Sequence, residues 1–259
     1  MFWQNESSGL NQRDDYWDVV AKNVKIYRRD IASIEPDSIV LRAKEGHSEA
    51  NLTIPADVLI CCTGWSEASP LYDVATAKDW GIPTSLDNED PAWKELDTHA
   101  EVDVLKRFPE LEHPPQYRKK SSAKTPFRLY KAMASIHEDA DRTLLFLGRL
   151  MVGNNFLIAE AQALWAVAFL DGHIKTSGSE MKQDIAEVVT WSRRRYLNKG
   201  QLGHWFFFDV LSYADMLLAQ LGLKSHRSKL WNKNMFGPVR AENVRGLLKE
   251  YQERYPAPE

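Results

Sequence analysis

Four polar residues have types and positions that could support chemistry. Asn154, Asn155 and Glu160 lie at the start of a long apolar run, and His204 stands between a glycine and a tryptophan. An amide can polarise a conjugated carbonyl, and a histidine can act as a general acid or base. Each also has a structural alternative: the asparagines can cap a helix, Glu160 can be a satisfied helix carboxylate, and His204 can be a structural hydrogen-bonding residue. No Ser-His-Asp or Cys-His arrangement follows from the spacing, so these four are the catalytic candidates.

Aromatic residues form the second group with a possible role, because the chain contains nine tryptophans. A single tryptophan is most often a core residue whose indole N–H needs a partner. Several aromatic side chains around one cleft would instead form the apolar kind of pocket that binds small molecules. The substrate-binding candidates are Trp65, Trp80, Phe156, Trp165 and Trp205.

Composition excludes several classes of partner. The 259 residues are 44% hydrophobic, which is enough to bury a core, and the formal net charge of -3 favours neither nucleic acid nor an anionic membrane as a partner. The run Arg193-Arg194-Arg195 is interpreted as a solvated helix face or a C-terminal helix cap. Residues 1–15 lack the apolar core of a signal peptide, and no window approaches the length of a membrane span. We therefore expect a cytoplasmic protein that does not insert into a membrane.

The two cysteines, Cys61 and Cys62, are neighbours in an apolar run. Adjacent cysteines are poorly placed to bridge each other, and the sequence has no third cysteine, so we expect no disulfide, as in a reducing compartment. No histidine, cysteine or carboxylate stands at ligand spacing from them, so we expect no metal site.

The first quarter of the sequence is typical of short strands. Residues 23–27 alternate between apolar and polar, and residues 31–34 and 38–41 flank a Glu-Pro-Asp turn. A further strand over 51–54 ends before a proline. Residues 57–62 are a continuous apolar run, which predicts a strand buried on both faces.

The rest of the sequence is irregular at first and then helical. Prolines punctuate residues 70–126, where 101–108 predicts a short helix. Residues 143–148 predict a second buried strand. A helix is expected over 156–170, between an asparagine cap and Gly172, and it should be buried because it is apolar nearly all round. Amphipathic helices are expected over 180–196, 208–221 and 241–255.

Three segments together resemble flavin-containing monooxygenases of the fungal type. In that family a hydrophobic strand ends in Ala-Thr-Gly-aromatic where the chain re-enters the flavin domain; here the strand ends in Cys62-Thr63-Gly64-Trp65, with Cys62 in place of the alanine. Residues 142–148 and 154–165 are similar to the last flavin-domain strand and the helix that follows it. Between Trp65 and residue 142, Pro126-Phe127-Arg128-Leu129-Tyr130 resembles a recurrent element of the fungal members. Their order along the chain makes the resemblance specific.

The resemblance implies flavin contacts at Thr63, Gly64, Gly148 and Asn155, because N–H groups at a strand end and a helix start stabilise the flavin ring. Flavin binding also needs a strand, a Gly-x-Gly-x-x-Gly turn and a helix that holds the pyrophosphate. The sequence contains no such turn, neither for FAD nor for a nicotinamide nucleotide. We therefore interpret the chain as the C-terminal half of such an enzyme, N-terminally truncated, with vestigial contact positions and no cofactor.

The expected fold class is α+β: a small β-meander left from a FAD-binding domain, followed by a helix-rich C-terminal half. We expect one compact domain over residues 1–259. It would comprise a β-rich part (1–65), an irregular, partly helical excursion (66–142) and a strand with helices (143–259).

Three functions compete, in this order. In the first, a former flavoenzyme is retained as a cofactor-independent catalyst of secondary-metabolite biosynthesis, which promotes a cyclisation, a Diels–Alder-type cycloaddition or an isomerisation of a small apolar metabolite in an aromatic-lined cleft. Such reactions need shape, desolvation and one or two hydrogen-bond donors. In the second, the chain is a C-terminal fragment or subunit of a FAD- and NADPH-dependent monooxygenase. In the third, it is a non-catalytic scaffold.

The resemblance also implies a gap in a sheet. The strands expected over 57–62 and 143–148 would flank a central strand that this sequence lacks, which would leave unpaired edges and a bare apolar face. Residues 1–20 are too polar to replace a central strand. We therefore expect a second copy of the chain to cover the gap in a homodimer.

Overall fold

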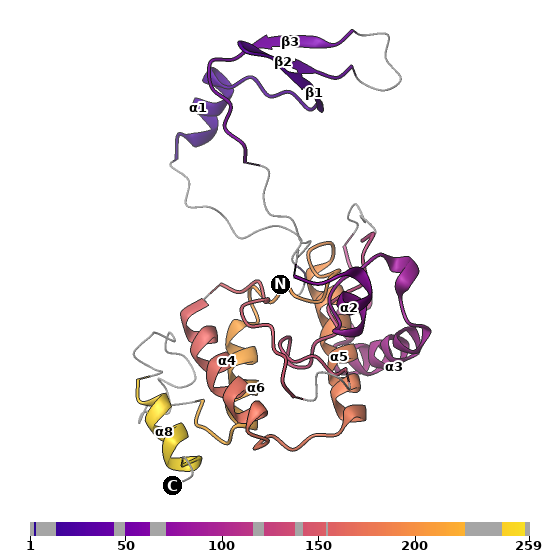
Figure 1. Ribbon diagram of the computed structural model, residues 1–259, viewed down its shortest axis with the longest axis vertical. Coiled ribbons are helices and arrows are strands. Elements are labelled where there is room, and N and C mark those ends of the chain that lie inside the picture. Colours follow the sequence, from indigo (N-terminus) through magenta and orange to yellow (C-terminus); the bar gives the residue numbers. More distant parts are fainter. Residues whose placement is uncertain are drawn as a thin grey trace. The chain divides into compact units, whose positions relative to one another are not determined.

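The computed structural model describes residues 3, 14–43, 50–62, 71–115, 122–137, 142–153, 155–225 and 245–256. Contacts group the chain into two units, one of residues 7–69 and one of residues 1–6 with 70–259, and each is described by itself (Figure 1). The first holds a three-stranded antiparallel sheet and the second holds most of the helices, so the expected α+β class is confirmed. That the whole chain makes one domain stays a prediction.

The sheet of the first unit is a simple meander. Strands β1 (Ile31–Ile34), β2 (Ser38–Leu41) and β3 (Leu52–Pro55) pair in the order β1-β2-β3, and each neighbouring pair is antiparallel. The Glu35 N–H donates to the Ser38 carbonyl at 2.9 Å, which closes the turn that the Glu-Pro-Asp sequence predicts. These three strands confirm the sequence prediction to within a residue at each end.

The strand expected over 23–27 is wrong. Helix α1 (Tyr16–Asn23) ends where that strand would begin, and the Val24 N–H still donates to the Val20 carbonyl at 2.9 Å. Residues 24–27 then run without strand pairing, and 71% of Ile26 is exposed. An alternating pattern needs a neighbouring strand to become β-structure, and the described part of the unit offers none here.

The buried strand expected over 57–62 is also wrong. These residues belong to no strand, and Val58, Leu59 and Ile60 are 76%, 43% and 79% exposed. The apolar composition correctly indicates that this run should be covered. However, β3 ends at Pro55, and no described segment lies beside the run to pair with its backbone.

The second unit is built from helices joined by irregular segments (Figure 1). Within it, helix α3 packs against α5, and helix α4 packs against α6. The elements are α2 (Val74–Asp79), η1 (Leu86–Asn88), α3 (Pro91–Arg107), η2 (Pro109–Leu111), α4 (Asn155–Leu170), α5 (Gly178–Tyr196), α6 (Val210–Gln220) and α8 (Leu247–Arg254).

The expected long helix is confirmed as α4, and it forms the centre of the main core. Gly172 follows it at φ +70°, and the His173 N–H donates to the Ala168 carbonyl at 2.9 Å, as in a glycine-ended helix. The burial expected all round is only partly correct. Ala159, Ala163 and Val167 are exposed at four-residue spacing, because the described neighbours of α4 cover its other faces.

The strand expected over 143–148 is wrong as well. Leu145 forms one isolated antiparallel bridge with Ala134, and Phe146 donates its N–H to the Met133 carbonyl at 2.8 Å. Among the described residues, only segment 133–135 pairs with residues 143–148. At Gly148 the chain takes φ +71° and turns away, which ends the extended backbone.

The other helices follow the sequence with shifted ends. The short helix expected over 101–108 is the end of the longer α3, because Asp90 caps the helix and Pro91 occupies its first position. The amphipathic helices are confirmed as α5, α6 and α8, except that residues 241–244 lie outside the described part. No described helix combines the length and the hydropathy needed to span a membrane.

Candidate functional site

One pocket of the second unit stands on an irregular backbone ladder between residues 81–86 and 123–128. The Arg128 N–H donates to the Gly81 carbonyl at 2.7 Å, and the Thr125 N–H donates to the Thr84 carbonyl at 2.8 Å. The Thr84 N–H in turn donates to the Thr125 hydroxyl at 2.9 Å. Gly81 has φ +77°, and a Cβ there would lie 2.4 Å from the Arg128 carbonyl oxygen. Only glycine fits this crossing.

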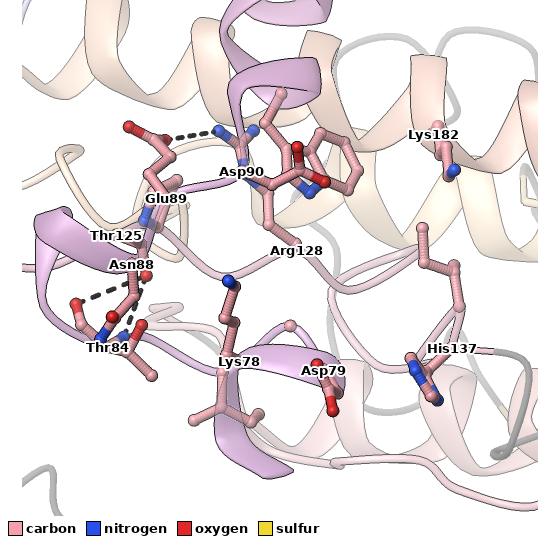
Figure 2. Close-up of a pocket in the computed structure, with 15 residues that line it drawn as sticks. Lys78, Asp79, Thr84, Asn88, Glu89, Asp90, Thr125, Arg128, His137 and Lys182 are labelled. Atoms are coloured by element: carbon pink, nitrogen blue, oxygen red, sulfur yellow. Dashed lines mark hydrogen bonds and ion pairs between the residues drawn. The ribbon is translucent and has the colours of Figure 1, made fainter. Parts of the chain in front are cut away.

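The pocket encloses about 360 Å³, which lies within the size range of small-molecule sites. Five short stretches of chain contribute to it, the first starting on α2 and the last lying on α5 (Figure 2). The lining residues are Lys78, Asp79, Gly81, Ile82, Thr84, Asn88, Glu89, Asp90, Trp93, Thr125, Pro126, Arg128, Ile136, His137 and Lys182.

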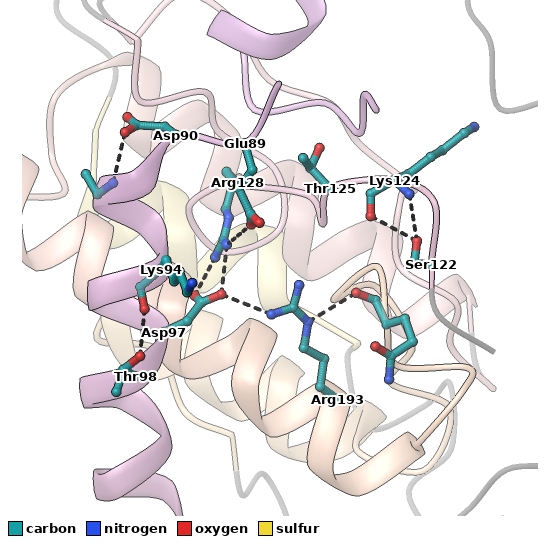
Figure 3. Close-up of polar contacts among 12 residues, drawn as sticks. Glu89, Asp90, Lys94, Asp97, Thr98, Ser122, Lys124, Thr125, Arg128 and Arg193 are labelled. Carbon is teal, nitrogen blue, oxygen red and sulfur yellow. Dashed lines mark hydrogen bonds and ion pairs between the residues drawn. The ribbon is translucent and has the colours of Figure 1, made fainter. Parts of the chain in front are cut away.

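Arg128 anchors one wall of this pocket through a network of charged groups (Figure 3). Its guanidinium donates to both carboxylate oxygens of Asp97, at 2.7 and 2.8 Å, and to Glu89 at 3.2 Å. The guanidinium also lies 4.5 Å from the ring centroid of Trp93. A bidentate pair that stacks on an aromatic ring holds the arginine in one geometry. Arg128 is therefore a fixed part of the wall, with only 6% of its side chain exposed.

Arg193 continues the network toward α5. It donates to Asp97 at 3.0 Å and to the Gln201 carbonyl at 3.3 Å, so Asp97 bridges two arginines (Figure 3). Burial lowers the pKa of Arg193, and the nearby Asp97 carboxylate opposes that effect. A neighbouring arginine, Arg194, pairs with Glu101. Arg193 and Arg194 thus join α5 to α3 and do not form a solvated face. All three arginines of the run lie in the last turn of α5, as the alternative interpretation, a C-terminal helix cap, expects.

A groove of about 590 Å³ lies on the other side of this network, between α3 and α5. It shares Glu89 with the first pocket, and its floor carries the pairs of Arg193 with Asp97 and Arg194 with Glu101. Because its charges already neutralise one another, we interpret the groove as a helix-packing seam.

A second polar network lies in the core beside α4. The Gly148 N–H donates to the Gln162 side-chain oxygen at 3.3 Å, the Gln162 amide donates to the Tyr213 hydroxyl at 3.0 Å, and that hydroxyl donates to the Lys131 carbonyl at 2.8 Å. The Lys131 ammonium pairs with Asp184. Burial raises the pKa of Tyr213, which keeps the hydroxyl protonated as a donor.

The structure does not bring the sequence-predicted residues together around one cleft. Trp165 is 0% exposed, its indole N–H donates to Gln220 at 2.7 Å, and its ring stacks on Phe169 with centroids 5.0 Å apart. It thus has the contacts of a core residue. Glu160 is half-buried on α4. The backbone of Asn155 and Phe156 begins α4, and Asn154 lies outside the described residues.

The remaining candidates lie in other places of the same unit. Trp80 packs edge-on against Tyr72 in a small aromatic cluster. His204 and Trp205 lie on one extended stretch that pairs with Met151, and His204 borders a void of only about 10 Å³. Thr63, Gly64 and Trp65 lie outside the described residues. The catalytic and substrate-binding roles of all these residues stay predictions.

Sequence reasoning missed Arg128, Asp97, Trp93 and Lys78 as site residues. One signal pointed at this place: Pro126-Phe127-Arg128-Leu129-Tyr130, which resembles a recurrent element of fungal monooxygenases, forms part of the pocket wall. The partners of Arg128 lie 31 and 39 residues earlier in the sequence. No spacing rule connects charges so far apart.

The described residues do not supply a dinucleotide site. The sheet is antiparallel and no helix follows a parallel strand through a glycine-rich turn, which is the arrangement that holds a pyrophosphate. The N–H of Gly148, one of the proposed vestigial contact positions, is used by Gln162 within the chain. Flavin therefore does not fit the described part of this chain by itself. The same part holds no group of three histidine, cysteine or carboxylate residues placed to bind a metal ion.

Comparison with known proteins gives the class to which this architecture is related. The chain is 26% identical to an FAD-dependent monooxygenase of Aspergillus nomiae, 27% identical to one of Fusarium langsethiae and 26% identical to one of Aspergillus sclerotiorum. Each similarity covers 97% of this chain and 44% of the relative. No protein-family model and no solved structure matches the chain.

The homologues of this chain are thus fungal FAD-dependent monooxygenases, which confirms the resemblance seen in the sequence. The chain spans less than half the length of the curated relatives that it matches.

Proposed function

We propose that this chain is the C-terminal part of a FAD-dependent monooxygenase and acts together with a polypeptide segment that carries the dinucleotide-binding fold, in the same chain or in a separate one. The similarity to the relatives named above runs along nearly the whole chain, which supports an inherited role. The chain itself lacks the glycine-rich turn for flavin.

The observation that carries this proposal is the exposed apolar run at residues 58–60. Val58 and Ile60 are more than three-quarters exposed, although the run has the composition of a strand covered on both faces. Burial of apolar surface stabilises by about 25 cal/mol per Å², so such a run favours any partner that can cover it. A flavin-domain segment that adds strands beside the run would bury it and pair its backbone.

Cofactor-independent cyclisation, cycloaddition or isomerisation is the second candidate. The missing dinucleotide turn favours it, because the chain alone has no redox centre to use. It requires an apolar cleft near the first turn of α4. The two larger described pockets instead include charged pairs in their lining and no residue of α4, and Trp165 is enclosed in the core. We therefore rank it, and the scaffold role, below the monooxygenase part.

The test is flavin retention with and without the complementary segment. We expect the purified chain alone to carry no yellow flavin absorbance. When it is co-expressed with the N-terminal remainder of the Aspergillus sclerotiorum relative, we expect a complex that retains FAD. The double variant Val58→Asp/Ile60→Asp should leave the free chain folded, because both side chains are exposed, and should abolish the complex.

The control is Val102→Asp on α3, which places one such carboxylate at a position 63% exposed in the other unit and should leave the complex intact. Tight FAD binding by the chain alone would contradict the proposal. Failure of wild-type chain and remainder to associate, with both folded by circular dichroism, would favour the cofactor-independent candidate.

A further inference from the structure

We propose that the Arg128-walled pocket binds a small molecule with an anionic head group, a carboxylate or a phosphate, on an apolar body. This inference does not depend on the monooxygenase proposal. It rests on the charge that remains in the pocket after the pairs within the protein are counted.

The acidic residues of the pocket are mostly engaged. Glu89 accepts from Arg128 at 3.2 Å, and the Asp90 carboxylate accepts from the Ala92 N–H at 2.9 Å as the cap of α3. The Glu89 charge is therefore compensated by a guanidinium, and the Asp90 charge is offset in part by the helix start. Asp79 is the lining carboxylate that makes no hydrogen bond or ion pair among the described residues.

Two of the cationic residues are not engaged. The side-chain ammonium groups of Lys78 on α2 and Lys182 on α5 form no hydrogen bond or ion pair in the described part of the chain, although both residues line the pocket. Figure 2 shows Lys78 extending from α2 toward the middle of the lining residues, while Lys182 and His137 lie apart from each other at the right of the view. Against these two ammonium groups stand Asp79 and the part of the Asp90 charge that the helix start leaves, so the lining keeps a surplus of positive charge, which favours an anion.

The apolar part of the lining indicates that the rest of the ligand, beyond its anionic head group, is apolar. Ile82, Pro126 and Ile136 come from three separate stretches, and Trp93 adds an aromatic ring whose position Arg128 fixes. Apolar walls with a few convergent polar groups are typical of sites for small organic molecules. The amide of Asn88 is also within the lining and could donate to a second polar atom of the ligand.

Titration calorimetry on the whole chain tests this site with three probes of one shape: benzoate, phenyl phosphate and the neutral benzyl alcohol. We expect the two anions to bind, more weakly as salt is added, and the alcohol to give no saturable signal. The tighter of the two anions identifies the head group. Lys78→Met and Lys182→Met should each weaken anion binding about tenfold, since each removes one charged hydrogen-bond donor.

The matched control is Lys106→Met, which removes an exposed lysine of α3 outside the pocket and should leave the dissociation constants unchanged. Circular dichroism establishes that the variants are folded. Equal binding of benzyl alcohol and benzoate, absence of binding by both anions, or unchanged affinity in the Lys78→Met and Lys182→Met variants would overturn the proposal.

Discussion

At the scale of single residues, Asp97 is the carboxylate that pairs with two arginines. Its carboxylate accepts from Arg128 and Arg193, and its side chain is only 16% exposed. Two arginines that converge on one carboxylate would repel each other without it. Asp97 lies on α3 and Arg193 lies on α5, so this carboxylate connects the two helices. Through Arg128 it also connects them to the pocket wall.

We expect Asp97→Asn to lower the free energy of unfolding by about 3–5 kcal/mol, because removing one partner of a buried pair leaves uncompensated charge. Arg128→Lys should also destabilise, since an ammonium cannot form the bidentate contact. Urea unfolding followed by circular dichroism measures both. The control Glu253→Gln breaks an exposed pair with Lys249 on α8, whose side chains are 82% and 68% exposed, and should change the free energy by less than about 1 kcal/mol. Equal effects of Asp97→Asn and the control would show that the network contributes nothing.

At the scale of elements, α5 begins with a complete capping box. The Ser177 hydroxyl accepts from the Glu180 N–H at 3.3 Å, and Glu180 accepts from the Ser177 N–H at 2.7 Å. This capping box begins a helix that carries both Asp184 and Arg193, so it positions members of both polar networks.

We expect Ser177→Ala to destabilise the protein by about 1 kcal/mol, the usual cost of losing a helix cap. The pH dependence follows from Glu180, whose pKa is lowered chiefly by the hydrogen bond from the Ser177 N–H. A carboxyl with a lowered pKa in the folded state stabilises above its ordinary pKa of 4.5, and this contribution is lost as the pH falls through the folded value. The difference in melting temperature between wild type and Glu180→Gln should therefore shrink on acidification below that value.

Glu187→Gln is the control, because it removes the same charge from α5 outside the cap, where Glu187 contacts only Gln183 at 3.3 Å. Its effect at neutral pH should be smaller than that of Glu180→Gln. A difference between wild type and Glu180→Gln that stays constant down to acidic pH would contradict the role given to the cap.

At the scale of the whole molecule, the strand edges from which a homodimer is expected are not formed. Residues 57–62 and 143–148 would supply those edges, and they belong to no strand. What remains is exposed apolar surface, which includes Val58 and Ile60. Surface of this kind is a site of association, whether with a second copy or with another segment.

We expect the isolated chain to self-associate at micromolar concentrations through that run, in competition with the flavin-domain segment. Sedimentation velocity should show a dimer that Val58→Asp/Ile60→Asp shifts to monomer, whereas Val102→Asp should leave the dimer unchanged. Addition of the N-terminal remainder of a relative should dissociate the self-associated form. A monomeric wild-type chain at all accessible concentrations would refute the expectation.

Local signals determined a large part of this protein. Turn residues and alternation predicted the meander of β1, β2 and β3, and periodicity with capping residues predicted α4, α5 and α6. These elements follow from the sequence because a turn, a cap or an amphipathic face depends on residues within one or two turns of each other. The order of three segments that resemble fungal flavin-containing monooxygenases likewise indicated the fungal FAD-dependent monooxygenases that the comparisons then showed as homologues.

Tertiary structure alone decided the rest. The runs 57–62 and 143–148 have strand composition, but a strand also requires a neighbouring backbone, and composition carries no information about that neighbour. The pocket was not predictable for the same reason: Lys78, Trp93, Arg128 and Lys182 meet only because α3 packs on α5 and Gly81 lets two segments cross closely. Contacts between residues far apart in the sequence depend on packing, and packing is a property of the whole fold.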